Sequence, residues 1–255
     1  MSHEPQSQSG LDRYRRNFLG KVGATVVGAT LGPGIFLHGL AQAKSPSDPV
    51  SASTRWGMLI DSNRCGTGCD ACVRGCNDEH GLTQHAHPAT DAQWIRKLDA
   101  HDPQTNHNIS LPMMCQHCEH PPCVDVCPTG ASFRRADGIV LVDKHLCIGC
   151  RYCMMACPYK ARSFIHETLH DQLSYAPRGK GTVESCTLCV HRVDAKGKDA
   201  IPACAEACTA DGHKAMVFGD MNDPDSELSR RLSALGGKQI RADLGLNTGI
   251  RYVGI

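Results

Sequence analysis

The protein has 255 residues, 16 of them cysteines, and a formal net charge of +1 at neutral pH. A charge so close to zero gives no support for a nucleic-acid-binding surface, which needs clustered basic residues. Aromatic residues make up only 5% of the chain, which is low for an ordinary apolar core. The composition therefore favours a core that is partly inorganic and a fold that depends on bound metal.

The N-terminus carries the pattern of an export signal. Arg15-Arg16-Asn17-Phe18-Leu19 resembles a twin-arginine signal, residues 22–40 are mildly apolar, and Ala41-Gln42-Ala43 offers a cleavage site. We therefore expect a signal peptide over residues 1–43, export of the folded protein by the twin-arginine route, and a periplasmic location at the inner membrane. The alternative is that the segment stays uncleaved as a membrane anchor.

The first cysteine group is preceded by a linker and a strand. Residues 44–55 are rich in serine, proline and alanine and predict the linker, and the apolar run Trp56–Asp61 predicts the strand. After the group, residues 77–111 form an insertion with several histidines. No pair of these histidines has the spacing of a metal-binding helix, so the insertion favours solvated loop histidines over a metal site.

The cysteines form four groups along the chain. Gaps of two to four residues separate the cysteines of the first three groups, whereas the fourth contains one gap of 14 residues. The groups are Cys65, Cys69, Cys72 and Cys76; Cys115, Cys118, Cys123 and Cys127; Cys147, Cys150, Cys153 and Cys157; and Cys186, Cys189, Cys204 and Cys208.

The third group has the spacing of a bacterial ferredoxin, C-x2-C-x2-C-x3-C followed by proline. In that run, three cysteines hold one iron–sulfur cluster and the fourth reaches the other cluster of a pair. Zinc fits poorly, since structural zinc sites place two ligands, a gap and two more ligands. Disulfides are disfavoured because bridges between such close neighbours would be strained. We therefore interpret the cysteine groups as iron–sulfur ligands.

The residues between the second and third groups predict a hairpin. Residues 131–142 contain the turn signal Asp137-Gly138 between two short apolar stretches. Inside the second group, His117 and His120 either ligate iron or lie beside a cluster. Four cysteines already complete a ligand set, which favours the second interpretation.

Basic residues surround the third group. They either screen an anionic cluster, meet a partner protein or lie on a solvated face, and the sequence leaves these interpretations open. The residues are Arg151, Lys160 and Arg162.

After the last cysteine, residues 215–218 predict a strand. A helix is expected from Asp223 as N-cap, with Pro224 at its first position, to Gly236. Its apolar face, packed on the core or open to a partner, would consist of Leu228, Leu232 and Leu235. Residues 238–255 give no assignment.

These elements predict an α+β fold of two ferredoxin-like double-cluster modules with short hairpins, short helices and irregular loops. The sequence has no C-x-x-C-H haem motif, P-loop or dinucleotide-binding motif. The expected divisions are a signal peptide (1–43), a linker (44–55), a four-cluster region (56–212) and a C-terminal strand, helix and tail (213–255). Module two is expected over 112–160.

Three motifs resemble a known family: Cys115–Cys123 with its Glu119-His120-Pro121-Pro122, Cys127-Pro128-Thr129-Gly130-Ala131, and Cys147-Ile148-Gly149-Cys150-Arg151-Tyr152-Cys153. They look like the ferredoxin-like beta subunits of complex iron–sulfur molybdoenzymes and their NrfC-type relatives, which are four-cluster electron-transfer subunits. The resemblance spans Trp56 to Leu235. Within the family, the chain looks most like the periplasmic iron–sulfur subunits of the membrane complex associated with dissimilatory sulfite reductase, because of its separate export signal and its lack of a catalytic domain.

The resemblance implies four [4Fe–4S] clusters and no catalytic residues. It pairs the first group with the fourth, which gives module one over 56–76 with 184–212, and the second group with the third, which gives module two over 112–160. The implied ligand sets are set one (Cys65, Cys69, Cys72, Cys208), set two (Cys76, Cys186, Cys189, Cys204), set three (Cys115, Cys118, Cys123, Cys157) and set four (Cys127, Cys147, Cys150, Cys153).

The resemblance also implies a function. The chain would not be an enzyme but would relay electrons between a quinone-linked NrfD-type membrane subunit and other redox subunits, among them a multihaem cytochrome c, in dissimilatory sulfur metabolism. The alternatives are a beta subunit of a periplasmic molybdopterin reductase acting on polysulfide or tetrathionate, or of a nitrite reductase system. A substrate bound at an open cluster is disfavoured, because 16 cysteines complete four sets.

Overall fold

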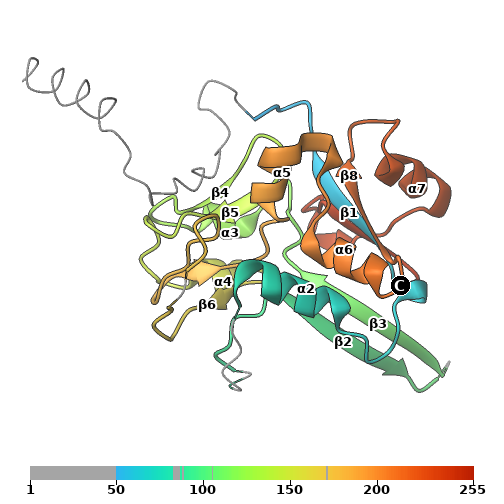
Figure 1. Ribbon diagram of the computed structural model, residues 1–255, viewed down its shortest axis with the longest axis horizontal. Coiled ribbons are helices and arrows are strands. Elements are labelled where there is room, and N and C mark those ends of the chain that lie inside the picture. Colours follow the sequence, from blue (N-terminus) through green and yellow to red (C-terminus); the bar gives the residue numbers. More distant parts are fainter. Residues whose placement is uncertain (1–49, 83–86, 88, 105, 171) are drawn as a thin grey trace, which may run out of the picture. The chain divides into compact units, whose positions relative to one another are not determined.

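The computed structural model describes residues 50–82, 87, 89–104, 106–170 and 172–255, and the predicted signal peptide lies outside them. Short helices and small sheets alternate along this part of the chain (Figure 1), in agreement with the predicted α+β class. The strands are β1 (Trp56–Asp61), β2 (Ile95–Asp102), β3 (His107–Met114), β4 (Ser132–Arg134), β5 (Val140–Val142), β6 (Ser163–Phe164), β7 (Val183–Glu184), β8 (Met216–Asp220) and β9 (Ile250–Val253). The α-helices are α2 (Ala71–His80), α3 (Pro122–Asp125), α4 (Tyr152–Ala156), α5 (Val190–Lys196), α6 (Ala203–Ala210) and α7 (Glu227–Leu235), and short 3-10 helices are η1 (Ser62–Arg64), η2 (Gly197–Asp199) and η3 (Ala242–Leu244).

The three-stranded sheet has the order β8-β1-β9, with β1 antiparallel to β8 and parallel to β9. The predicted strand before the first cysteine group is therefore confirmed, and it lies at the centre of this sheet. Met58 is fully buried, and Trp56 stacks on Phe218 of β8 with ring centroids 5.2 Å apart. The unassigned C-terminal tail supplies β9, where Tyr252 is also fully buried.

Residues 77–111 depart from the expectation of solvated loops. Helix α2 continues to His80, which is buried, and β2 and β3 form an antiparallel hairpin. The alternation of Ile109, Leu111 and Met113 with other residues is the period-two signal of a strand. The histidines around this segment obscure that signal in the sequence.

The predicted hairpin between the second and third cysteine groups is confirmed. Strands β4 and β5 pair antiparallel, with Ser132 opposite Val142. Gly138 adopts the positive φ of 89° that this turn requires. Helices α3 and α4, one on each side of the hairpin in the chain, contact each other.

The C-terminal helix begins later than the sequence predicts. Helix α7 starts at Glu227, and its N-cap is Ser226, whose Oγ accepts a hydrogen bond from the backbone N–H of Ser229 (3.0 Å). Asp223 instead closes the preceding turn, where its carboxylate accepts a hydrogen bond from the N–H of Asp225 (3.0 Å). The expected N-cap therefore stabilises the turn before the helix.

The apolar face of α7 packs only in part on the sheet. Leu228 is fully buried, whereas Leu235 is exposed, and the helix contacts β8 and β1. Gly236 ends the helix in the left-handed conformation, with a φ of 65°, as predicted.

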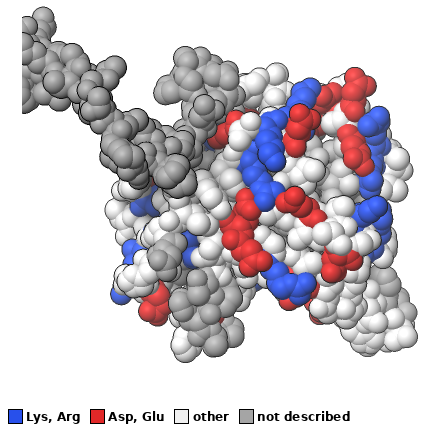
Figure 2. Space-filling view, viewed as in Figure 1, with Lys and Arg blue, Asp and Glu red and all other residues white. Residues whose placement is uncertain are grey.

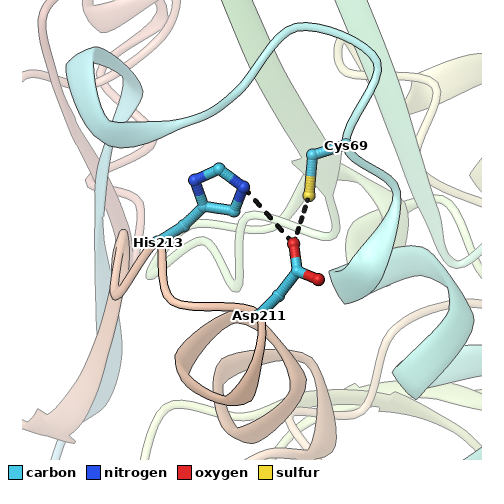
Figure 3. A group of neighbouring side chains, drawn as sticks. All are labelled: Cys69, Asp211 and His213. Atoms are coloured by element: carbon cyan, nitrogen blue, oxygen red, sulfur yellow. Dashed lines mark hydrogen bonds and ion pairs between the residues drawn. The ribbon is translucent and has the colours of Figure 1, made fainter.

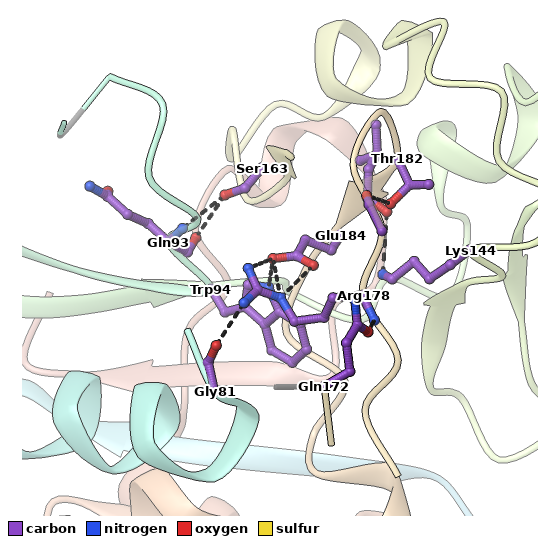
Figure 4. A network of polar contacts seen from close by, with 11 residues as sticks. Gly81, Gln93, Trp94, Lys144, Ser163, Gln172, Arg178, Thr182 and Glu184 are labelled. Carbon is purple, nitrogen blue, oxygen red and sulfur yellow. Dashed lines mark hydrogen bonds and ion pairs between the residues drawn. The ribbon is translucent and has the colours of Figure 1, made fainter. Parts of the chain in front are cut away.

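A buried polar network fixes the connection between the third and fourth cysteine groups (Figure 4). Glu184 of β7 is fully buried, forms an ion pair with Arg178 (2.8 Å) and accepts a hydrogen bond from Trp94 Nε1 (3.0 Å). Arg178 also donates to the carbonyl oxygen of Gly81, directly after α2 (2.7 Å). Because removing one partner of a buried ion pair is strongly destabilising, this network ties the connection to α2 and β2.

The described surface mixes both signs of charge. On the face seen in Figure 2, basic and acidic side chains are interspersed, in keeping with the net charge of +1. Among the described residues, no helix combines the length and the apolar character needed to cross a bilayer.

Candidate metal centres

The sixteen cysteines are all free. The structure places the members of each implied set near one another, while their role as cluster ligands stays a prediction. Sets three and four each line a cavity of their own. Burial raises the pKa of Cys72 in set one and of Cys76 in set two. In each set, the charges of the other three thiols raise that pKa further. The iron-ligand role of these cysteines stays a prediction, but four sulfurs converge at each of four places.

Sets one and two are built on helices α2 and α6, which contact each other (Figure 1). Cys72 and Cys76 lie one turn apart on α2, and Cys204 and Cys208 lie one turn apart on α6. Cys72 meets Cys208 and Cys76 meets Cys204, so the two helices are antiparallel. Neighbouring sets therefore share both helices and lie close to each other.

Sets three and four repeat this arrangement on a smaller scale. Cys123 of α3 and Cys157, directly after α4, belong to set three. Cys127, after α3, and Cys153 of α4 belong to set four. Contact between α3 and α4 again places one cysteine of each helix region in each set.

The loop of the third group depends on Gly149. Its φ is 71°, and an added Cβ would lie 2.1 Å from the carbonyl oxygen of Gly181. Only glycine combines this backbone conformation with so close an approach. The glycine between Cys147 and Cys150 therefore lets the loop close against the 159–183 connection.

Burial raises the pKa of several thiols. It raises the pKa of Cys72, Cys115 and Cys118 to about 12 and that of Cys189 to about 11. These thiols would hold their protons at neutral pH without a metal. Metal binding would therefore release protons as it folds the site.

Backbone N–H groups donate to several sulfurs. Such donors are one of the factors that set the potential of an iron–sulfur cluster. The pairs are Ser132 to Cys127 (3.3 Å), Val183 to Cys147 (3.4 Å), Leu188 to Cys186 (3.4 Å), Ala203 to Cys189 (3.4 Å) and Ala215 to Cys208 (3.4 Å). Convergent thiols with amide donors around them fit an anionic iron–sulfur cluster.

Set one has charged neighbours that carry no sequence motif. Asp211, directly after α6, accepts a hydrogen bond from Cys69 Sγ (3.3 Å) and pairs with His213 Nε2 (3.3 Å) (Figure 3). Lys97 of β2 donates to the carbonyl oxygens of Gly66 (2.9 Å) and Cys69 (2.8 Å). The tertiary fold brings an anion and a cation to the same set, and no local pattern in the sequence indicates either of them.

The histidines of the second group have different surroundings. His117 is buried, and its Nδ1 accepts a hydrogen bond from the N–H of Val140 (3.0 Å), while burial lowers its pKa to about 3. His120 is exposed. A histidine that the sequence did not single out, His80, lies with its Nε2 3.5 Å from Cys189 Sγ of set two.

Comparison with known proteins identifies the family. Residues 107–221 match the 4Fe-4S dicluster domain. The chain is 41% identical over 263 residues to Hdr-like menaquinol oxidoreductase iron-sulfur subunit 1 of Archaeoglobus fulgidus, and the match covers 93% of this chain and 97% of the relative. The chain belongs to the NrfC-like family of 4Fe-4S electron-transfer subunits.

Two further relatives lie in the same family. This NrfC-like chain is 37% identical over 253 residues to a tetrathionate reductase subunit of Salmonella typhimurium, with 96% of this chain and 90% of the relative covered. It is 39% identical over 179 residues to NrfC of Escherichia coli, with 70% and 71% covered. The relatives include iron–sulfur and reductase subunits, which confirms the family resemblance.

Proposed function

We propose that this NrfC-like chain is a periplasmic iron–sulfur subunit that relays single electrons and performs no substrate chemistry of its own. Each [4Fe–4S] cluster, when bound, would take up and pass on one electron. The sixteen cysteines of sets one to four would hold four such clusters. Sets one and two would form one double-cluster module, and sets three and four the other.

This proposal rests on a linear order of the four sets, which we infer from the contact of α2 with α6, the contact of α3 with α4, and the thiols that join neighbouring sets. Three pairs of thiols join neighbouring sets. In each pair, the negative charge of the first thiol raises the pKa of the second, which burial also raises. The pairs are Cys72 and Cys76, Cys115 and Cys186, and Cys153 and Cys123. These pairs join set one to set two, set two to set three, and set three to set four. Such an order suits stepwise electron transfer along the chain.

The ends of this order are more exposed than its middle. In sets two and three all cysteines are buried except Cys157, which is half-buried. Cys65 and Cys69 of set one are half-buried, and Cys150 of set four is exposed. Electrons would therefore enter and leave at sets one and four, while the protein insulates the centres between them.

For location and partners, we propose export by the twin-arginine route and a DsrO-like role in dissimilatory sulfur metabolism. An NrfD-type integral membrane subunit linked to quinone would hold the protein at the inner membrane. A multihaem cytochrome c and other Dsr subunits would complete the complex. The relative named as part of a menaquinol oxidoreductase supports the link to a quinol pool.

A second candidate function is the beta subunit of a periplasmic molybdopterin reductase. The similarity to the tetrathionate reductase relative, over 96% of this chain, favours it. The arrangement of the cysteine sets would be the same in both cases. A nitrite reductase system, the other alternative that the family resemblance implies, would use the same arrangement of cysteine sets.

The experiment that tests this proposal is an anaerobic pull-down of the tagged protein from solubilised membranes, with mass spectrometry of the retained proteins. An NrfD-type protein together with a multihaem cytochrome and sulfite-reductase-associated subunits would support the DsrO-like role. A large molybdopterin subunit in their place would assign the chain to the second candidate. Recovery of the protein from the cytoplasmic fraction alone would contradict the proposed location.

A further inference from the structure

Arg162 is buried beside sets three and four. Only 5% of its surface is exposed, whereas the other two basic residues of this region, Arg151 and Lys160, are exposed. A solvated face, one of the interpretations that the sequence leaves open, is therefore wrong for Arg162. Its burial calls for an anion close by, because an arginine side chain stays charged in a protein.

The guanidinium of Arg162 contacts sulfur in set three and lies near set four. Nη2 donates to Cys123 Sγ of set three (3.1 Å) and to Ser132 Oγ (2.8 Å). The charge of Arg162 also lowers the pKa of Cys153 of set four, against the larger raising effect of burial. One cation therefore contacts a thiol of set three and acts electrostatically on a thiol of set four.

The charge of Arg162 is balanced by sulfur. In the part of the chain that the structure describes, no carboxylate pairs with it. The groups whose negative charge would raise its pKa are Cys123, Cys115 and Cys153, once metal binding has removed their protons. Its Nη1 is buried and has no hydrogen-bond acceptor among the described atoms. Because an uncompensated buried charge is strongly unfavourable, the counter-charge has to come from these sulfurs and from what they hold.

We propose that Arg162 is the shared counter-ion of the clusters in sets three and four and raises the reduction potentials of both. This inference rests on the proposed function, since it needs clusters in those sets. Arg162 acts through the cysteine ligands, so it is a positioning residue and not a catalytic one.

The sign of the effect follows from charge. An added electron makes a cluster more negative, and a nearby cation stabilises the more negative form. A buried cation acts more strongly than a surface cation, whose field is screened by water and salt. Loss of Arg162 should therefore lower two potentials together, whereas loss of the exposed Arg151 should change them little.

The test compares Arg162→Gln and Arg162→Lys with the control Arg151→Gln, which removes the same charge from an exposed side chain next to Cys150. Each full-length variant is purified anaerobically, its iron and sulfide are quantified, and its cluster potentials are measured by redox titration monitored by electron paramagnetic resonance. With four clusters retained, Arg162→Gln should lower two of the four potentials by a tenfold change or more in the reduction equilibrium, about 59 mV for one electron. Arg162→Lys should lower the same two potentials by less, and Arg151→Gln should change none of them by that amount.

Several results would overturn the inference. Unchanged potentials in a fully loaded Arg162→Gln protein would exclude the counter-ion role, and a fall in one potential alone would exclude its sharing between two clusters. If Arg162→Gln loses clusters, Arg162→Lys decides: retention of all four clusters in the Lys variant supports the inference, because the charge alone restores the site, and loss of the same clusters contradicts it. Absence of iron and sulfide from the unaltered protein would instead refute the proposed function, before any variant is compared.

Discussion

Gly75 of α2 lies so close to Ala207 of α6 that an added Cβ would be 2.6 Å from the Cβ of Ala207. This contact allows the two helices to bring the cysteines of sets one and two together. Gly75→Ala should separate the helices and remove about half of the bound iron, although alanine in a helix is ordinarily more favourable than glycine by about 1 kcal/mol. Iron and sulfide analysis of the anaerobically purified variant measures the loss.

Gly179→Ala is the matched control. A Cβ at Gly179 would lie 3.6 Å from the nearest atom, a methyl carbon of Thr182, which is an ordinary contact. This variant should keep its full iron content. A fully loaded Gly75→Ala protein would show that close approach of α2 and α6 is not required.

The cysteine groups can be recognised in the sequence because ligation of an iron–sulfur cluster requires closely spaced cysteines. Thiols two to four residues apart can surround one cluster, so the groups can be found without a structure. The pairing of distant groups cannot be found that way, because no spacing specifies that Cys72 meets Cys208. Gly75 is part of the cause, but its role becomes visible only when the contact between α2 and α6 is known.

Cys150 is the one exposed cysteine of the sixteen. Cys150→Ser should damage the cluster of set four, with loss of about a quarter of the iron, because the other three sets keep all their ligands. Iron and acid-labile sulfide, together with paramagnetic resonance spectra, measure how many clusters remain. Loss of all the iron would contradict the division into two modules.

Asp211 and Lys97 place opposite charges beside Cys69. Asp211→Asn removes a negative charge and should raise the potential of the set-one cluster, whereas Lys97→Gln removes a positive charge and should lower it. Because Asp211 is exposed, its effect should be screened and stay below a tenfold change in the reduction equilibrium, under about 59 mV. Redox titration of both variants measures the shifts, and shifts of the same sign would refute the electrostatic explanation.

Glu79 links α2 to α5 through Arg192 (2.6 Å) and His191 (2.7 Å). The hydrogen bonds from Arg192 lower the pKa of Glu79 to about 2, below the usual value of 4.5, so this stabilisation is present above pH 4.5 and is lost as the pH falls towards 2. At neutral pH, Glu79→Gln should lower the free energy of unfolding by about 1–2 kcal/mol, because it weakens hydrogen bonds between charged groups.

Anaerobic urea unfolding of the loaded protein measures the effect of Glu79→Gln. The control is Glu227→Gln, which breaks the exposed pair between Glu227 and Arg231 on α7 and should cost less than about 0.5 kcal/mol. Equal losses of unfolding free energy in the two variants would mean that the link between α2 and α5 stabilises the protein no more than a surface ion pair does.

The elements that the sequence does not predict are those with weak or long-range signals. Strand β9 pairs with β1, from the opposite end of the described chain, and leaves no local signature. At the start of α7, Asp223 and Ser226 are both good N-cap residues, so the local sequence does not choose between them. The fold selects Ser226, whose Oγ also donates to the carbonyl oxygen of Asp220 at the end of β8 (2.7 Å).

The central claim is that one chain holds four one-electron centres in a linear order. Reductive titration of the anaerobically purified full-length protein, followed by absorbance and paramagnetic resonance, tests it most directly. We expect the uptake of about four electrons per chain and magnetic interaction between neighbouring centres. Uptake of two electrons or fewer, or zinc in place of iron, would contradict the claim.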